Sequence, residues 1–207
     1  MSFDVVMARM AQLQGLMSPA AVQATPPAAA AATPTATPVA TFASQLQTAS
    51  SPATLTSAPP ASSAGQAIVN LVSKEVGVSE EPKGSNDSPR IAQYRQATAG
   101  SGVGPWCAYY TSWAAREAGV PLGDNGQGFG RVDDVYAWAQ KTGKAIPNTG
   151  SDVKPQPGDL IVWDEHIGVV ESVLPDGRIQ TIEGNSSDRV SRRVHAKGDA
   201  LGYVRMS

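Results

Sequence analysis

The chain has 207 residues and a formal net charge of −2, and 16% of its residues are charged. Its basic residues are scattered, so the basic patch typical of nucleic-acid-binding proteins is absent and no nucleic-acid partner is expected. No run approaches the roughly 20 apolar residues of a transmembrane helix, so no membrane-spanning segment is expected either.

Composition divides the chain into a sparsely charged part and a charged, aromatic part. The first 73 residues contain only two charged side chains, Asp4 and Arg9, and all tryptophans and tyrosines lie beyond them. Residues 18–64 are mostly Ala, Pro, Thr and Ser, which bury too little apolar area to offset chain entropy. We therefore expect a disordered linker at 18–64 and a folded domain at 65–207.

Residues 1–17 form a third segment with its own pattern. They lack the basic leader and uninterrupted apolar core of a secretory signal peptide. Their larger apolar residues recur at a helical spacing, which fits either a frayed amphipathic helix or a docking or export segment. The apolar positions are Phe3, Val6, Met7, Met10, Leu13 and Met17.

The folded part changes period along the chain. Helical patterns are predicted at 65–78, from Pro105 to Gly119, and at 132–143. Residues rich in Val and Ile, separated by turns, then predict strands. The predicted strands are 158–163, 166–173, 178–185, 189–195 and 201–206. Helices followed by neighbouring strands indicate an α+β domain with an antiparallel sheet.

Cys107 is the only cysteine, which excludes an internal disulfide and a Cys-rich zinc site. It falls in the first turn of a predicted helix, where exposed amides and the helix dipole favour a thiolate. A lone cysteine is also commonly a small buried apolar side chain. A nucleophilic role therefore depends on a suitably placed base.

The chain has two histidines that could serve as this base. His195 lies next to Arg192 and Arg193 and is interpreted as a surface residue of a strand. His166 begins a strand and is followed by the small Gly168, which leaves room in front of the ring. His166 is therefore the preferred base.

A histidine base needs a third group to orient its ring. If the hairpin closes through a four-residue loop at 174–177, His166 faces Asn185 and Gly168 faces Glu183. Residues that pair in this way share one face of the sheet. A three-residue loop with a bulge would change the pairing by one residue. The sequence thus places Glu183 and Asn185 beside the histidine, provided that the turn is correct.

With these residues identified, residues 65–207 resemble a CHAP domain, the cysteine/histidine-dependent amidohydrolase and peptidase family, which is related to NlpC-type and papain-like enzymes. The resemblance implies a papain-like α+β fold, Cys107 as nucleophile, His166 as base, and Glu183 with Asn185 completing the site. It implies no cofactor and no metal. It rests on "EVGVSEEPKGSNDSPRIAQY" (75–94), "PWCAYYTSW" (105–113), "PQPGDLIVWDEHIGVVESV" (155–173) and "TIEGNSS" (181–187).

Two positions depart from the family pattern. Glu165 stands where a glycine or serine often precedes the histidine, which alters the mouth of the cleft. Ser101 and Gly102 stand where papain-like relatives carry an oxyanion-binding glutamine, so backbone amides near Trp106 and Cys107 become the expected donors.

Three residues are the candidates for contacting substrate, namely Trp106, Trp163 and Asn86. For Asn86, a role in a turn is an equally good interpretation.

The resemblance implies hydrolysis of an amide in the peptide part of peptidoglycan, by an N-acetylmuramoyl-L-alanine amidase or an endopeptidase. Residues 1–17 and 42–50 are similar to N-termini of proteins encoded with flagellar components. Flagellar or other envelope-assembly proteins are thus expected partners besides peptidoglycan, and export by a non-Sec route to the wall, the periplasm or the medium is expected. Cytoplasmic location stays open. The alternatives are a non-catalytic wall-binding or assembly module and a cytosolic amidase acting on a small conjugated amide.

Overall fold

A computed structural model describes residues 61–150 and 152–206. The predicted segment 1–17 and nearly all of the predicted linker 18–64 lie outside the described residues. None of the described helices is long and apolar enough to span a membrane.

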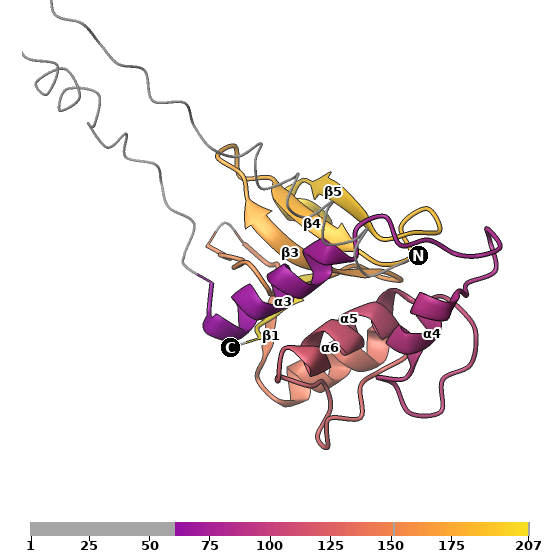
Figure 1. The fold of residues 1–207 in the computed structure, drawn as a ribbon. Coiled ribbons are helices and arrows are strands. Elements are labelled where there is room, and N and C mark those ends of the chain that lie inside the picture. The colour runs from indigo at the N-terminus through magenta and orange to yellow at the C-terminus, as the bar shows by residue number, and fades with distance from the viewer. Residues whose placement is uncertain (1–60, 151, 207) are drawn as a thin grey trace, which may run out of the picture. The chain divides into compact units, whose positions relative to one another are not determined.

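The described α-helices lie together on one side of the sheet (Figure 1), and a short 3-10 helix, η2 (Lys197–Asp199), connects β5 to β6. Two begin with a serine cap: the hydroxyl of Ser62 accepts the N–H of Gly65, and that of Ser88 accepts the N–H of Ile91. They are α3 (Ser63–Lys74), α4 (Pro89–Arg95), α5 (Cys107–Glu117) and α6 (Val132–Lys141). Helix α4 falls between the first two predicted helices, where no helix was expected, and its proline at the first turn is the local signal for it.

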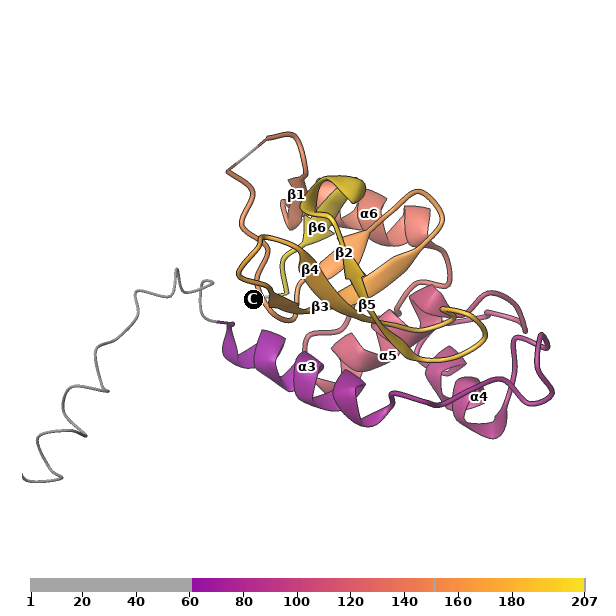
Figure 2. The same cartoon turned by 90° about the horizontal axis from the view of Figure 1, so that it is seen from above.

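The strands form one antiparallel sheet in the order β1-β6-β2-β3-β4-β5. The five strands predicted from the sequence all occur, and the short edge strand β1 is additional. In Figure 2, β1 and β6 lie at the α6 end of the sheet, and α3 and α4 lie toward the other end. The strands are β1 (Ala145–Pro147), β2 (Leu160–Val162), β3 (Ile167–Val173), β4 (Ile179–Glu183), β5 (Ser191–His195) and β6 (Gly202–Val204).

The two faces of the sheet bury different clusters of side chains. One face packs on the helices, with Val169 and Ile182 in the larger core cluster around α3 and α5. The other face buries Val170 and Ile179 with Tyr203 in a smaller cluster. Because strand residues alternate between faces, His166 and Glu183 belong to the face of the smaller cluster. The layer of helices and the antiparallel sheet together confirm the predicted α+β class.

The register of the β3–β4 hairpin corrects one prediction. The four-residue turn, which would pair Val173 with Arg178, is wrong, because Val173 pairs with Ile179. A bulge at Glu171 then shifts the register by one, so that Val169 pairs with Ile182. The misassigned turn and the unforeseen bulge shift the pairing by one residue in opposite directions. Beyond the bulge, β3 and β4 are therefore aligned as predicted.

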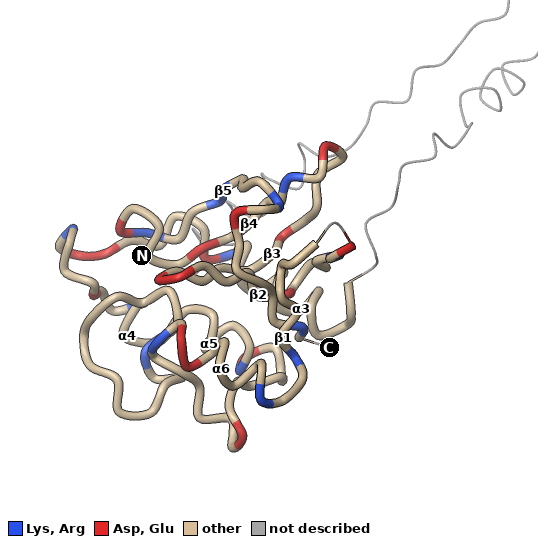
Figure 3. The backbone as a smooth tube through the Cα atoms, turned by 180° about the vertical axis from the view of Figure 1, so that it is seen from behind, with Lys and Arg blue, Asp and Glu red and all other residues tan. Residues whose placement is uncertain are grey.

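Lys and Arg are spread over several elements and interspersed with Asp and Glu (Figure 3). One ion pair joins the end of α3 to α4, where Arg90 contacts Glu75 at 2.6 Å. Tyr94 also donates its hydroxyl to Glu75, at 2.5 Å. This cluster fastens α4 against α3 and α5 without reaching the cysteine.

Candidate active site

Cys107 is the first residue of α5 and lies at the edge of a cleft of about 460 Å³. Its side chain is 5% exposed. The residue at the N-cap, Trp106, provides no side-chain acceptor for the first turn, so the backbone N–H groups there keep their capacity to stabilise negative charge. The local structure thus places a thiol at a helix start beside a cavity.

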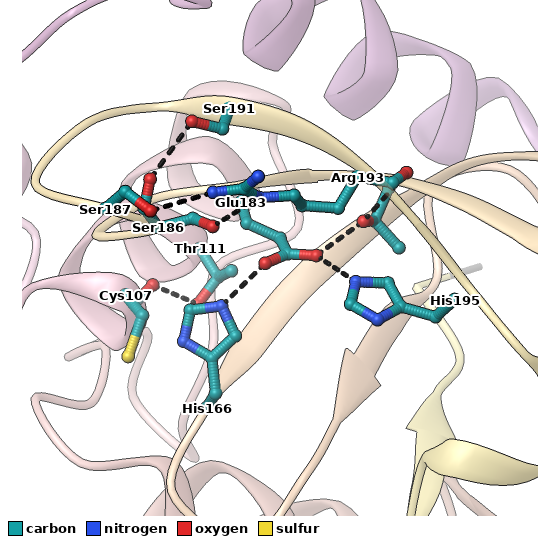
Figure 4. A network of polar contacts seen from close by, with 10 residues as sticks. Cys107, Thr111, His166, Glu183, Ser186, Ser187, Ser191, Arg193 and His195 are labelled. Carbon is teal, nitrogen blue, oxygen red and sulfur yellow. Dashed lines mark hydrogen bonds and ion pairs between the residues drawn. The ribbon is translucent and has the colours of Figure 1, made fainter.

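His166 immediately precedes β3, and its ring lies between Cys107 and Glu183 (Figure 4). Its Nε2 is 2.9 Å from Glu183 Oε2, which leaves Nδ1 as the ring nitrogen for Cys107. Burial lowers the pKa of His166, but hydrogen bonds with Cys107 and Glu183 outweigh it and raise the pKa from about 6.5 to about 9. The ring is therefore suited to hold the proton of the thiol.

Glu183 ends β4 and is almost fully buried, at 2% exposure. It accepts hydrogen bonds from His166, from Thr181 Oγ1 at 2.6 Å and from His195 Nε2 at 2.6 Å. Burial raises the pKa of Glu183, but the bonds from these three side chains outweigh it and lower the pKa to about 2. Glu183 is therefore a carboxylate at neutral pH and can stabilise a charged His166.

Two glycines allow these groups to approach one another. A Cβ on Gly168 would lie 2.7 Å from Cγ of Glu183, so only glycine fits opposite this side chain. A Cβ on Gly184 would lie 2.7 Å from Cβ of Tyr110, which shows how closely the end of β4 packs on α5. The predicted pairing of Gly168 with Glu183 agrees with this contact.

His195 is part of the same group, and its interpretation as a plain surface residue is wrong. Figure 4 shows the rings of His195 and His166 on either side of the Glu183 carboxylate. Trp163 contacts both rings: it stacks on His166, with centroids 5.6 Å apart, and lies tilted against His195, with centroids 4.7 Å apart. The signal for His195 was available, since pairing Glu183 with Ser191 puts residues 191, 193 and 195 on the face of Glu183.

The hydrogen-bond partners of the Asn185 side chain are Trp106 and Glu80 rather than His166. In the orientation that gives both ends of its amide a partner, Oδ1 accepts the N–H of Trp106 and Nδ2 donates to Glu80 Oε1, each at 3.3 Å. The expectation that Asn185 helps to orient the histidine is therefore not supported. Instead, the amide connects the end of β4 to the residue before the cysteine.

The three predicted substrate contacts differ in outcome. The Trp106 side chain is fully buried, so its ring lies in the core rather than in the cleft, and that prediction is wrong. Asn86 is not among the cleft residues, and its backbone N–H donates to Glu80 Oε2 at 2.9 Å, which fits the turn interpretation. Trp163 lines a smaller depression of about 140 Å³. Glu80 was not singled out from the sequence.

The cleft beside Cys107 is lined on its far side by polar residues. Glu165, which departs from the family pattern, lies at its wall together with Asp164. The depression that contains Trp163 shares Asp164 with this cleft, and both also include Val132 and Asp133. The two hollows therefore adjoin at the start of α6.

In this α+β fold, a thiol at the start of a helix, an imidazole and a buried carboxylate lie in that spatial order. This is the arrangement expected of a cysteine hydrolase. In agreement, residues 98–185 match the family model described as CHAP domain. This part of the chain is therefore similar to the CHAP domain, a family of cysteine/histidine-dependent amidohydrolases and peptidases. No curated protein and no solved structure matches the chain.

Proposed function

We propose that this protein hydrolyses an amide bond in the peptide part of bacterial peptidoglycan, through a thioester formed on Cys107. The observation that carries the proposal is the position of the His166 ring between Cys107, which lines the cleft, and the buried carboxylate of Glu183, 2.9 Å from Nε2 of the ring (Figure 4). The identity of the wall as substrate is supported by the match to the CHAP domain.

In this mechanism, the thiol proton of Cys107 moves to Nδ1 of His166, while Nε2–H stays bound to Glu183. The thiolate attacks the amide carbonyl, and the carbonyl oxygen takes negative charge beside the helix start. His166 then gives its proton to the departing amine as the C–N bond breaks. Water loses a proton to His166, attacks the thioester and releases the acid and the thiol.

The proposal is tested by incubating purified peptidoglycan with wild type and with Cys107→Ala, followed by mass spectrometry of the released fragments. New amino termini without new glycan reducing ends, seen only with wild type, are the expected result. The fragments also identify the bond and so separate an amidase from an endopeptidase. Identical fragment patterns from the two proteins would overturn the hydrolase proposal and favour a wall-binding module. Cleavage of small conjugated amides with no action on wall would favour the cytosolic amidase.

We further propose an extracytoplasmic location, reached by a non-Sec route that uses residues 1–17, and a role beside flagellar or other envelope-assembly proteins. The support is the sequence pattern of residues 1–17 and of the Ala/Pro/Thr-rich stretch that follows, which together suit a tethered enzyme. Secretion of the full chain is compared with that of a variant lacking residues 1–20. Undiminished secretion of the shortened chain would contradict this route.

A further inference from the structure

Glu80 is a buried carboxylate outside the matched range 98–185, at 6% exposure. Its Oε1 accepts the indole Nε1–H of Trp106 at 2.9 Å, and its Oε2 accepts the backbone N–H of Asn86 at 2.9 Å. The amide of Asn185 adds a third donor, at 3.3 Å from Oε1. Burying a carboxylate costs free energy, and none of these three donors is a cation that would offset the charge. The position of Glu80 therefore needs an explanation.

The partners of Glu80 lie on both sides of the candidate active site. Trp106 directly precedes Cys107, and Asn185 follows Glu183 by two residues. Asn185 also accepts the backbone N–H of Trp106, so the three residues form a closed loop of hydrogen bonds. Glu80 thereby connects the start of α5 with the end of β4, the two elements that carry the thiol and the carboxylate.

The backbone around Glu80 is itself fixed. The N–H of Glu80 donates to the carbonyl of Asp188 at 2.9 Å, and the N–H of Val190 donates to the carbonyl of Val78 at 2.8 Å. These bonds align residues 78–80 beside the chain that enters β5. The carboxylate is consequently held in one place and can act as a fixed point for its partners.

The same loop of bonds decides which backbone amide is free. Since the N–H of Trp106 is taken by Asn185, the N–H of Cys107 is left as the better placed donor for a developing oxyanion. We propose that Glu80 is a positioning residue, which acts through Trp106 and Asn185 to set the place of Cys107 and of this N–H relative to His166. The proposal rests on the active site described under the proposed function.

The test uses Glu80→Gln, with Glu81→Gln as the matched control because Glu81 is the exposed neighbour with the same charge. Glutamine presents an NH₂ group to three donors, so at least one contact is lost. Cys107 is the only cysteine, so the rate of its alkylation by iodoacetamide against pH reports on the thiol and its histidine without substrate. We expect Glu80→Gln to shift this profile and to lower kcat on wall by about 100-fold, with KM little changed.

A double variant, Glu80→Gln with Asn185→Asp, reverses the donor and acceptor of their hydrogen bond and keeps the total charge. Partial recovery of kcat and of the alkylation profile is expected, because the bond between positions 80 and 185 is restored while the indole N–H of Trp106, which shares Oε1 with Asn185, still lacks its acceptor; a role in stability alone would not produce this recovery. The double variant also carries the test if Glu80→Gln does not fold. The inference is overturned if Glu80→Gln behaves like Glu81→Gln, if it lowers only the melting temperature, or if the double variant recovers nothing. Absence of wall cleavage by wild type would instead refute the proposed function, because the alkylation profiles remain measurable.

Discussion

The contact between Gly168 and Glu183 gives a sharp prediction for Gly168→Ala. The added Cβ would lie 2.7 Å from Cγ of Glu183, whereas ordinary contacts begin at 3.4 Å, so one group must move by about 0.7 Å. Glu183 is buried and held by hydrogen bonds from three side chains. We expect its movement to lengthen the hydrogen bond with His166. That bond would lengthen from 2.9 Å to about 3.6 Å, beyond the range of a hydrogen bond.

We expect Gly168→Ala to lower kcat by about 100-fold and to cost roughly 1–3 kcal/mol of unfolding free energy. Because Glu183 raises the pKa of His166, that pKa should also fall from about 9 toward its ordinary value. The assays are fragment release from purified wall and NMR titration of the ring. Gly198→Ala is the control, since a Cβ there meets nothing within 4 Å. A folded Gly168→Ala protein with wild-type kcat and titration would refute the reasoning.

Three further predictions concern the groups around this site and the helix layer. Hydrogen bonds outweigh burial and hold the pKa of Glu183 at about 2 against an ordinary 4.5, so its stabilising effect is present above pH 4.5 and lost as pH falls through 2. The free energy of unfolding, measured with urea, should fall by up to roughly 3 kcal/mol between pH 4.5 and pH 2 in wild type and should not show this fall in Glu183→Gln. Parallel plots of unfolding free energy against pH for the two proteins would contradict this prediction. His195→Ala should lower kcat about 10-fold, and His195→Gln, which keeps an N–H donor, should lower it less; equal values for both variants would argue against the bond. Glu75→Gln weakens the contacts with Arg90 and Tyr94 and should cost about 1–3 kcal/mol in thermal unfolding without changing alkylation of the thiol; an unchanged melting temperature would show that this ion pair is not stabilising.

The sequence predicted the elements that carry strong local signals. Segments rich in Val and Ile, separated by turns, indicated the strands, and Pro105 with Gly119 bounded α5 to within two residues. Cys107, His166 and Glu183 were identified because their chemistry requires a nucleophile, a base and an orienting carboxylate. The structure brings these three together.

The missed features depend on contacts that local patterns do not record. The bulge at Glu171 has no distinctive residue, so the turn was assigned wrongly although the distant pairing held. Glu80 and Glu81 are adjacent glutamates in one loop, and only tertiary packing makes one buried and the other exposed. For Trp106, an aromatic residue beside a nucleophile suggested substrate contact, but burial in the core proved stronger.

The central claim is that Cys107, His166 and Glu183 act as one proton-transfer unit. NMR titration of the His166 ring tests it most directly, with His195→Gln as background so that only one histidine signal remains. The account predicts a pKa of about 9, which drops when Cys107→Ala is added because contact with the cysteine contributes to the rise. A pKa near 6.5 that does not respond to Cys107→Ala would contradict it.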